Sequence, residues 1–156
     1  MKTTTIAMTL AGGVLVAALP ATVAQADDDR DVFRSGAYTV KRGQEIDGDL
    51  TVRGGTVTIY GSVDGNVRQI GKGSVVVKAS GDVDGNIVES GKGSVNVRGE
   101  VDGNISERGR GHVKIFRSAE VDGNVAERNK GNLVIWRGAD IDGNTSESGK
   151  GKRIRR

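Results

Sequence analysis

The chain has 156 residues, of which 25 are Gly, one is Pro and none is Cys, and only 3% are aromatic. This glycine share is far above the roughly 7% of average proteins, yet the chain lacks the every-third-residue period and the proline of collagen. The absence of Cys excludes a disulfide scaffold, and the shortage of large apolar side chains argues against a conventional globular core. The formal net charge of +3 is small, so composition alone leaves open either disorder or a repetitive fold.

Residues 1–26 have the pattern of a cleavable secretory signal peptide. Lys2 precedes an apolar run at residues 11–19, and the triplet Ala24-Gln25-Ala26 stands before three aspartates. The apolar run is shorter than the ~20 residues that span a bilayer, which favours cleavage after Ala26 over a retained membrane anchor. We therefore expect an exported protein without a transmembrane anchor, located in the periplasm, on the cell surface or in the medium.

Residues 27–42 form a short polar segment or cap, and residues 43–149 carry a repeat. The repeat is marked by an Asp-Gly pair that occurs six times, at Asp-to-Asp steps of 17, 20, 18, 20 and 20 residues. The glycine marks either a corner with positive φ or a close approach of two backbone segments, and the turn-forming dipeptides Asp-Gly and Gly-Asn favour the corner. An Asn follows the pair in the last five copies, which gives the structural positions Gly65, Asn66, Gly85, Asn86, Gly103, Asn104, Gly123, Asn124, Gly143 and Asn144.

Each copy from the second onward continues with an acid or amide, then a Gly-basic-Gly triplet or a close variant, and then a short apolar alternation. The alternation, as in Val75 and Val77 or Val95 and Val97, has the period of two that predicts strands with these residues on one face. The longer copies hold two extra residues after the alternation. Because two is the side-chain period, units of 18 and 20 residues keep the same residues facing inward.

These units predict an all-β fold, a single-domain parallel β-helix (β-solenoid) of roughly six coils with about 18–20 residues per coil. Each unit has room for two or three short strands and none for a helix. Layers such as Val63, Val67, Val75 and Val77 then fill a narrow interior, which explains the shortage of aromatic residues. Val76, Phe116, Val134 and Trp136 have the opposite parity and are expected to face outward. Since one 20-residue coil separates Phe116 from Trp136, a stacked surface pair is the first interpretation and a contact with another chain the second.

Stacked coils place equivalent residues about one strand spacing, ~4.8 Å, apart, so the sequence predicts side-chain columns. The asparagines form one column, in which each amide donates to the next carbonyl. The motif aspartates form a column of like charges, which turn N–H groups or cations must stabilise. We assign no metal site, but weak candidates for calcium are Asp64, Asp84, Asp102, Asp122 and Asp142. The triplets give a basic column, which would offset this charge if it lies on a neighbouring face: Lys72, Lys92, Arg110, Lys130 and Lys150.

The pattern hydrophobic-x-Gly-Asn-hydrophobic, at residues 83–87 and again at residues 101–105, resembles that of the bactofilins. The resemblance covers roughly residues 38–149. It implies a right-handed parallel β-helix that polymerises end to end without nucleotide and scaffolds envelope-associated machinery. The signal peptide departs from the family pattern, because bactofilins usually work on the cytoplasmic side of the membrane.

Catalysis is not expected, and neither is a cofactor. The carboxylates and basic residues recur in every coil, whereas a catalytic pair needs one unique place with two different environments. His112 is the only His and has no orienting partner in its sequence motif, which favours a turn residue. Nucleic acid is not expected as a partner, because the basic tail, residues 150–156, belongs to an exported chain and has no interleaved aromatic residues.

The sequence instead predicts an exported structural solenoid that self-associates or scaffolds at the cell envelope. End coils expose unpaired backbone groups, which invites an end-to-end homo-oligomer or polymer, although Val32, Phe33 and Tyr38 could form a small plug. The basic tail adds an anionic envelope surface or glycan as a candidate partner. The alternative is an adhesin-like module that binds a glycan or surface ligand through a ladder face.

Overall fold

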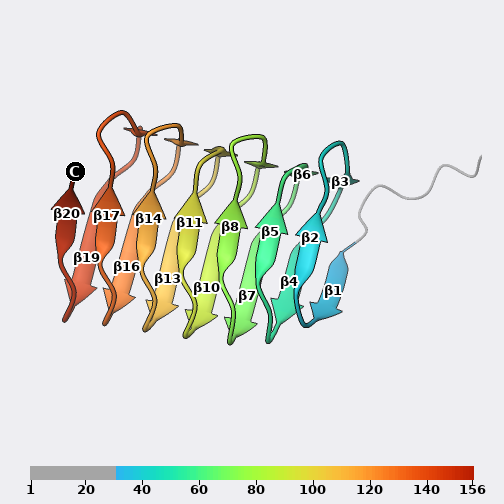
Figure 1. Cartoon of the computed structure of the whole chain (residues 1–156), viewed down its shortest axis with the longest axis horizontal. Helices are drawn as coiled ribbons and strands as arrows, with labels where there is room; N and C mark the ends of the chain where they lie inside the picture. The colour runs from blue at the N-terminus through green and yellow to red at the C-terminus, as the bar shows by residue number, and fades with distance from the viewer. Residues whose placement is uncertain (1–30) are drawn as a thin grey trace, which may run out of the picture.

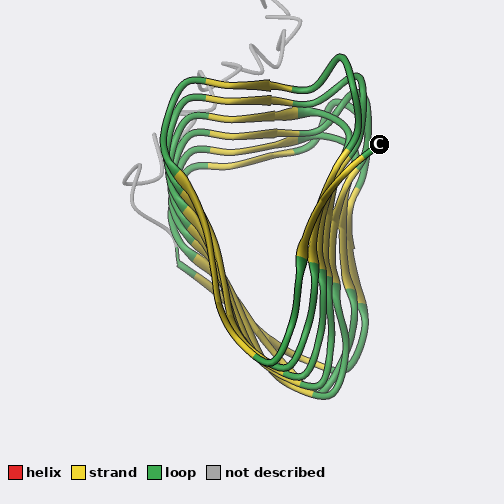
Figure 2. Ribbon diagram, turned by 90° about the vertical axis from the view of Figure 1, so that its left-hand side faces the viewer, coloured by secondary structure: helices red, strands yellow, loops and turns green. Residues whose placement is uncertain are grey.

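The computed structural model describes residues 31–156, so the signal peptide expected at residues 1–26 lies outside the described residues. Twenty short strands wind into a parallel β-solenoid of about six coils, which confirms the all-β fold expected from the repeat (Figure 1). The view along the stack shows a triangular outline with one sheet on each side (Figure 2). No helix among the described residues is long and apolar enough to cross a membrane.

Three parallel sheets form the sides of the triangle, and we call them walls A, B and C. Wall A contains β1 (Val32–Ser35), β4 (Leu50–Arg53), β7 (Val67–Gly71), β10 (Ile87–Gly91), β13 (Ile105–Gly109), β16 (Val125–Asn129) and β19 (Thr145–Gly149). Wall B contains β2 (Tyr38–Val40), β5 (Val57–Ile59), β8 (Val75–Val77), β11 (Val95–Val97), β14 (Val113–Ile115), β17 (Leu133–Ile135) and β20 (Arg153–Arg155). Wall C contains β3 (Glu45–Ile46), β6 (Ser62–Val63), β9 (Asp82–Val83), β12 (Glu100–Val101), β15 (Glu120–Val121) and β18 (Asp140–Ile141).

Three corners join these walls in chain order. The Asp-Gly-Asn motif turns the chain from wall C to wall A, and we call it the Asn corner. The Gly-basic-Gly triplet turns it from wall A to wall B, and this is the basic corner. The third, or variable, corner runs from wall B to wall C and holds the two extra residues of the longer units. Val95 therefore pairs in register with Val75 across a 20-residue step and with Val113 across an 18-residue step, as the side-chain period predicted.

The core is a stack of β-branched and leucine side chains that point inward from all three walls. Val63, Val67, Val75 and Val77 are fully buried, which confirms the predicted layer, and the corresponding residues of the next coil are equally buried. Small side chains suit this interior because three walls converge on a narrow space. Burying one such side chain stabilises the fold by roughly 1.5–3 kcal/mol.

The strands extend beyond the range expected for the repeats. Strands β1 and β2 lie within residues 27–42, and β20 lies within the basic tail and pairs with β17. These segments look polar in the sequence because their inward positions hold Arg34, Arg153 and Arg155, in register with Val52, Leu133 and Ile135. The end coils are therefore coils of the same stack with polar residues at core positions.

One residue departs from the expected outward set. Phe116, Trp136 and Val76 are half-buried on the outer surface, but Val134 is only 7% exposed. Val134 has the outward parity, and in the outer column of wall B it lies in register between Lys114 and Ile154. Long neighbours on both sides leave little of its surface exposed.

Candidate functional site

The Asn corner carries a continuous column of hydrogen bonds. The side-chain oxygen of Asn86 accepts two bonds from Asn104, one from its backbone N–H and one from its side-chain amide, both at 2.9 Å. The same pair of bonds links Asn66 to Asn86 and Asn104 to Asn124. The amide donation was predicted, and the backbone donation is an addition. Because the backbone leaves the sheet geometry at this corner, the Asn side chain supplies the acceptor that its N–H would otherwise lack.

The glycines of the Asp-Gly-Asn motif are explained by close approach, and the favoured interpretation of a positive-φ corner was wrong. Gly65, Gly85, Gly103, Gly123 and Gly143 are absent from the positive-φ region. A Cβ added to Gly103 would lie 2.5 Å from the carbonyl carbon and oxygen of Gly85 in the preceding coil. Each coil therefore rests on the backbone of the one before it, and only Gly fits.

A second column runs along the start of wall B, and it contains His112. The side-chain oxygen of Ser94 accepts from the backbone N–H of His112 at 3.0 Å, and His112 Nδ1 accepts from the backbone N–H of Asn132 at 2.8 Å. Nδ1 must be unprotonated to accept this bond, so the proton of the neutral ring lies on Nε2. His112 thus serves as one rung of a structural column, in the place that Ser74 and Asn132 occupy in other coils.

A third column, which sequence reasoning missed, consists of polar side chains inside the core. Gln69, Glu89, Glu107 and Glu127 are all fully buried, in register along wall A, and Glu147 continues the column at the end. The repeated acid or amide was visible in the sequence. Parity could have placed it inward, because each of the four fully buried members follows an inward Val or Ile by two positions.

The buried carboxyls are held by the basic corner. One oxygen of Glu107 accepts from the backbone N–H of Gly111 at 3.0 Å, and Glu89 and Glu127 accept in the same way from Gly93 and Gly131. Burial raises the pKa of Glu107 and that of Glu127 to about 7, against the lowering effect of these backbone bonds. The other carboxyl oxygen of Glu89, Glu107 and Glu127 is buried without a hydrogen-bond partner, which is consistent with carboxyls whose charged form is disfavoured.

The motif aspartates lie where the sequence placed them, in an exposed column next to wall C. These are the weak metal candidates Asp64, Asp84, Asp102, Asp122 and Asp142. Asp64 also meets Glu45 and Asp47, with carboxylate oxygens within 4.8 Å of one another. Partial desolvation and then the charges of Asp82 and Asp64 raise the pKa of Asp84. The column is therefore a surface of mutual repulsion, to which all six coils contribute.

Aromatic and cationic side chains form a column on the variable corner. The rings of Phe116 and Trp136 stack with centroids 4.4 Å apart and planes 11° apart, which confirms the predicted surface pair. The guanidinium of Arg98 lies 3.7 Å from the Phe116 ring centroid, and the ammonium of Lys78 lies 5.5 Å from that of Tyr60. These contacts add a cation–π column to the hydrogen-bonded ones.

The two ends of the core are closed by arginines. At the first coil, Arg34 from wall A lies 5.3 Å over the ring of Tyr38 from wall B. At the last coil, Arg153 from wall B donates to the backbone and side-chain oxygens of Thr145 in wall A, at 3.1 Å each. Val32 and Tyr38 are half-buried under the first closure, whereas Phe33 is 67% exposed.

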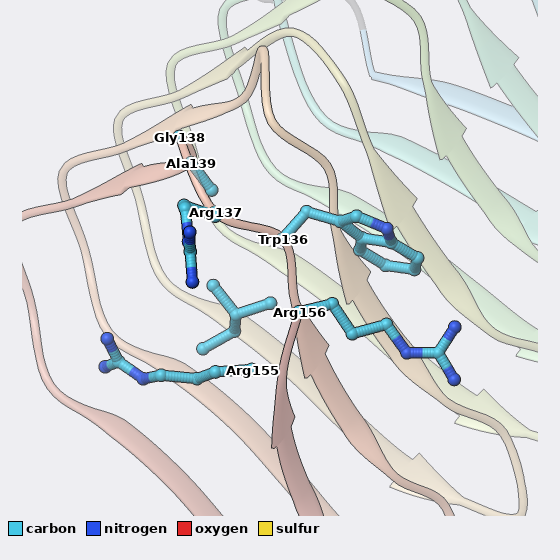
Figure 3. Close-up of a pocket in the computed structure, with 7 residues that line it drawn as sticks. Trp136, Arg137, Gly138, Ala139, Arg155 and Arg156 are labelled. Carbon is cyan, nitrogen blue, oxygen red and sulfur yellow. The ribbon is translucent and has the colours of Figure 1, made fainter.

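A hollow of about 330 Å³ opens beside the last coil. It lies where the variable corner meets β20, and arginines surround its apolar floor. The side chain of Arg156 extends in the same direction as Trp136, and that of Arg155 in the opposite direction (Figure 3). The lining residues are Ile135, Trp136, Arg137, Gly138, Ala139, Arg155 and Arg156.

The walls and columns define a structural β-solenoid, in which the same contacts recur from coil to coil. The chain belongs to the bactofilin family, because the family model described as "Bactofilin: Polymer-forming cytoskeletal" matches residues 38–146. The family is cytoskeletal and polymer-forming, not enzymatic, and it implies self-association. No curated protein and no solved structure matched the chain.

Proposed function

We propose that this bactofilin is exported and that its solenoids join end to end into a scaffold at the cell envelope. The observation that carries the axial joint is the state of the two ends. Among the described residues, β1, β2 and β3 at one end and β18, β19 and β20 at the other each have a single neighbour in their sheet. Such edges are templates for pairing with another copy, and all three walls offer them at both ends.

The backbone donors at the last coil point toward a following copy. The N–H of Val125 donates to Asn144 at 2.9 Å, and that of Leu133 donates to Lys152 at 3.0 Å. Thr145 and Arg153 hold the equivalent positions one coil further on, in register with Val125 and Leu133. Their N–H groups are therefore placed to donate to the first coil of the next solenoid.

The arginines at the two ends of the core determine which interactions can stabilise the axial joint. Arg34 and Arg153 hold positions that hydrophobic residues hold in inner coils, so the ends do not bury a large apolar surface against each other. The joint must depend mainly on backbone hydrogen bonds, and the two closures repel as like charges. We therefore expect salt to favour axial growth or leave it unchanged, because screening weakens that repulsion.

Electron microscopy of the mature chain from residue 27 tests the axial joint. We expect filaments, and we expect Thr145→Pro combined with Arg153→Pro to abolish them, because proline removes an outward donor from wall A and one from wall B. The matched control Thr145→Val keeps its N–H and restores the residue type of the preceding coil, so filaments should persist. A strict monomer that retains envelope polysaccharide would contradict the scaffold and support the adhesin-like alternative.

Export rests on the signal-type sequence of residues 1–26. We expect the protein isolated from cells to begin at Asp27 and to be found outside the cytoplasm. The residues Lys150, Lys152, Arg153, Arg155 and Arg156 gather at one end of the stack and supply a cationic surface for an anionic envelope component. N-terminal sequencing of the cell-derived protein checks the processing, and an intact Met1 would contradict it.

A further inference from the structure

Wall C and the adjoining Asn corner collect the exposed acidic residues of the solenoid. Within residues 32–156, each Asp and Glu either points into the core column or lies on this side, and no Lys or Arg belongs to a wall C strand. Two carboxylate columns run the length of the wall. One, interrupted by Ser62 in the second coil, contains Glu45, Asp82, Glu100, Glu120 and Asp140. The other contains Asp47, Asp64, Asp84, Asp102, Asp122 and Asp142.

The basic corner lies on the opposite side of the triangle. It joins walls A and B and is therefore the vertex that faces away from wall C (Figure 2). Its five triplet cations are all exposed: Lys72, Lys92, Arg110, Lys130 and Lys150. Arg108 and Arg128, near the ends of β13 and β16, are also exposed and add to this charge.

The two charged surfaces share one pitch. Each repeats once per coil, and the coils are one strand spacing, ~4.8 Å, apart. Two solenoids that lie side by side can therefore set the cations of one basic corner against the carboxylates of the other wall C, rung by rung. Charges placed at equal intervals on both partners stay in register along the whole length.

We propose that solenoids associate laterally, with the basic corner of one copy seated against wall C of the next. The two surfaces lie on opposite sides of one copy, so the contact is heterologous and leaves a free wall and a free corner on every pair. Repetition of the contact gives ribbons. This lateral contact adds to the axial joint of the proposed function and does not depend on it.

The carboxylates of wall C repel one another, so a cationic partner that binds to this wall would lower its electrostatic energy. The charge of Asp82, then desolvation and the charge of Glu120, raise the pKa of Glu100. Desolvation and the charge of Asp102 raise the pKa of Asp82. A cationic corner relieves this repulsion. Because each exposed pair is weak and screened beyond about 8 Å at physiological ionic strength, the ribbons should separate in high salt.

Charge reversal tests the contact. In the corner variant, Lys72→Glu, Lys92→Glu, Arg110→Glu and Lys130→Glu are combined. In the wall variant, both carboxylate columns are reversed over the middle coils, by Asp64→Lys, Asp82→Lys, Asp84→Lys, Glu100→Lys, Asp102→Lys, Glu120→Lys and Asp122→Lys. At low salt we expect the unmodified mature chain to form ribbons and each variant alone to lose them. An equal mixture of the two variants should regain ribbons, because each acidic corner then faces a basic wall and each basic corner an acidic wall.

The readouts are ribbon width by electron microscopy and light scattering at low and high salt, with circular dichroism to show that each variant folds. The control variant combines Arg42→Glu, Arg117→Glu and Arg137→Glu on the variable corner and should keep its ribbons. Lateral association that survives corner reversal, or a mixture that stays unassociated, overturns the proposal. The proposal is also overturned if the chain never associates laterally but binds anionic vesicles through its basic corner.

Failure of the axial joint gives a different result. If neither variant nor the unmodified chain forms filaments but the mixture still scatters light in a salt-sensitive way, the lateral contact is supported and the axial joint is contradicted. If single filaments form at all salt concentrations, the axial joint stands and the lateral contact is wrong.

Discussion

At the residue level, each inner Asn of the column is both a donor and an acceptor of hydrogen bonds. Asn104 donates to Asn86, and its oxygen accepts both N–H groups of Asn124. We expect Asn104→Ala to lower the free energy of unfolding by about 1–3 kcal/mol, since it removes three bonds and leaves a backbone N–H without its acceptor. Urea denaturation measures this.

Asn104→Asp provides the matched comparison. An Asp can accept both bonds from the next rung, as Asp49 does from Asn66 at 2.7 and 3.0 Å, but it cannot donate to Asn86. We expect its loss of stability to lie between those of the unmodified chain and Asn104→Ala. A loss of only a few tenths of a kcal/mol in the Ala variant would show that the Asn column contributes little to the stability of the fold.

The motif glycines predict a contrast between two kinds of Gly-to-Ala change. Gly103→Ala places a Cβ 2.5 Å from the backbone of Gly85, which cannot move without opening the stack. We expect a loss of at least about 1–3 kcal/mol, the usual cost of overpacking. Gly54→Ala has open space around its Cβ and a φ of 72°, so it carries only backbone strain of about 1 kcal/mol. Equal losses in both, by thermal or urea unfolding, would contradict close approach.

At the scale of the element, the buried carboxyl column makes stability depend on pH. The pKa values of Glu107 and Glu127 rise from the ordinary 4.5 to about 7 in the folded chain. A raised acid pKa means that the folded state binds protons more tightly, so its stabilising effect is complete below about pH 4.5 and is lost as pH rises toward and through 7. Because one pKa unit corresponds to about 1.4 kcal/mol, we expect a loss of at least that amount over this window.

Glu107→Gln should reduce this dependence, and Glu107→Gln combined with Glu127→Gln should remove most of it, because an amide does not titrate. The column tolerates an amide, since Gln69 occupies the equivalent position two coils earlier. The exposed Glu120→Gln on wall C serves as the control and should leave most of the slope in place. Unfolding free energies measured from about pH 4.5 to 8 show whether the buried carboxyls cause the pH dependence. A stability that rises with pH across that range would mean that the column is ionised in the folded chain.

The sequence predicts the elements better than it predicts the roles of their residues. Parity alone placed Val75 and Val77 in the core, and the spacing of the motif placed the Asn column. Parity also places the repeated glutamates inward, but a charged residue is ordinarily assigned to the surface. Only the folded coil shows that the basic corner, four residues further along the chain, supplies their N–H partners. The close contact of Gly103 with Gly85 is likewise a property of two coils, which the local turn statistics of Asp-Gly-Asn do not contain.

For the whole molecule, the surfaces for axial and for lateral association are different. Along the axis, the backbone N–H groups of residues such as Thr145 and Arg153 can pair with the first coil of another copy and so extend the sheets. Across the axis, wall C and the basic corner offer opposite charges at one pitch. The ends of the stack were the hardest part to predict from sequence, because Arg34 and Arg153 occupy core positions that a repeat pattern assigns to hydrophobic residues.

We propose that this bactofilin continues its own coil stack from one copy to the next. Fibre diffraction or high-resolution electron microscopy of the assembled mature chain tests it most directly. We expect a repeat of ~4.8 Å along the filament axis that runs through the joints without a break, since each copy adds its coils at the strand spacing. Filaments whose 4.8 Å repeat lies across the axis, or a chain that stays monomeric at every concentration, would contradict the account.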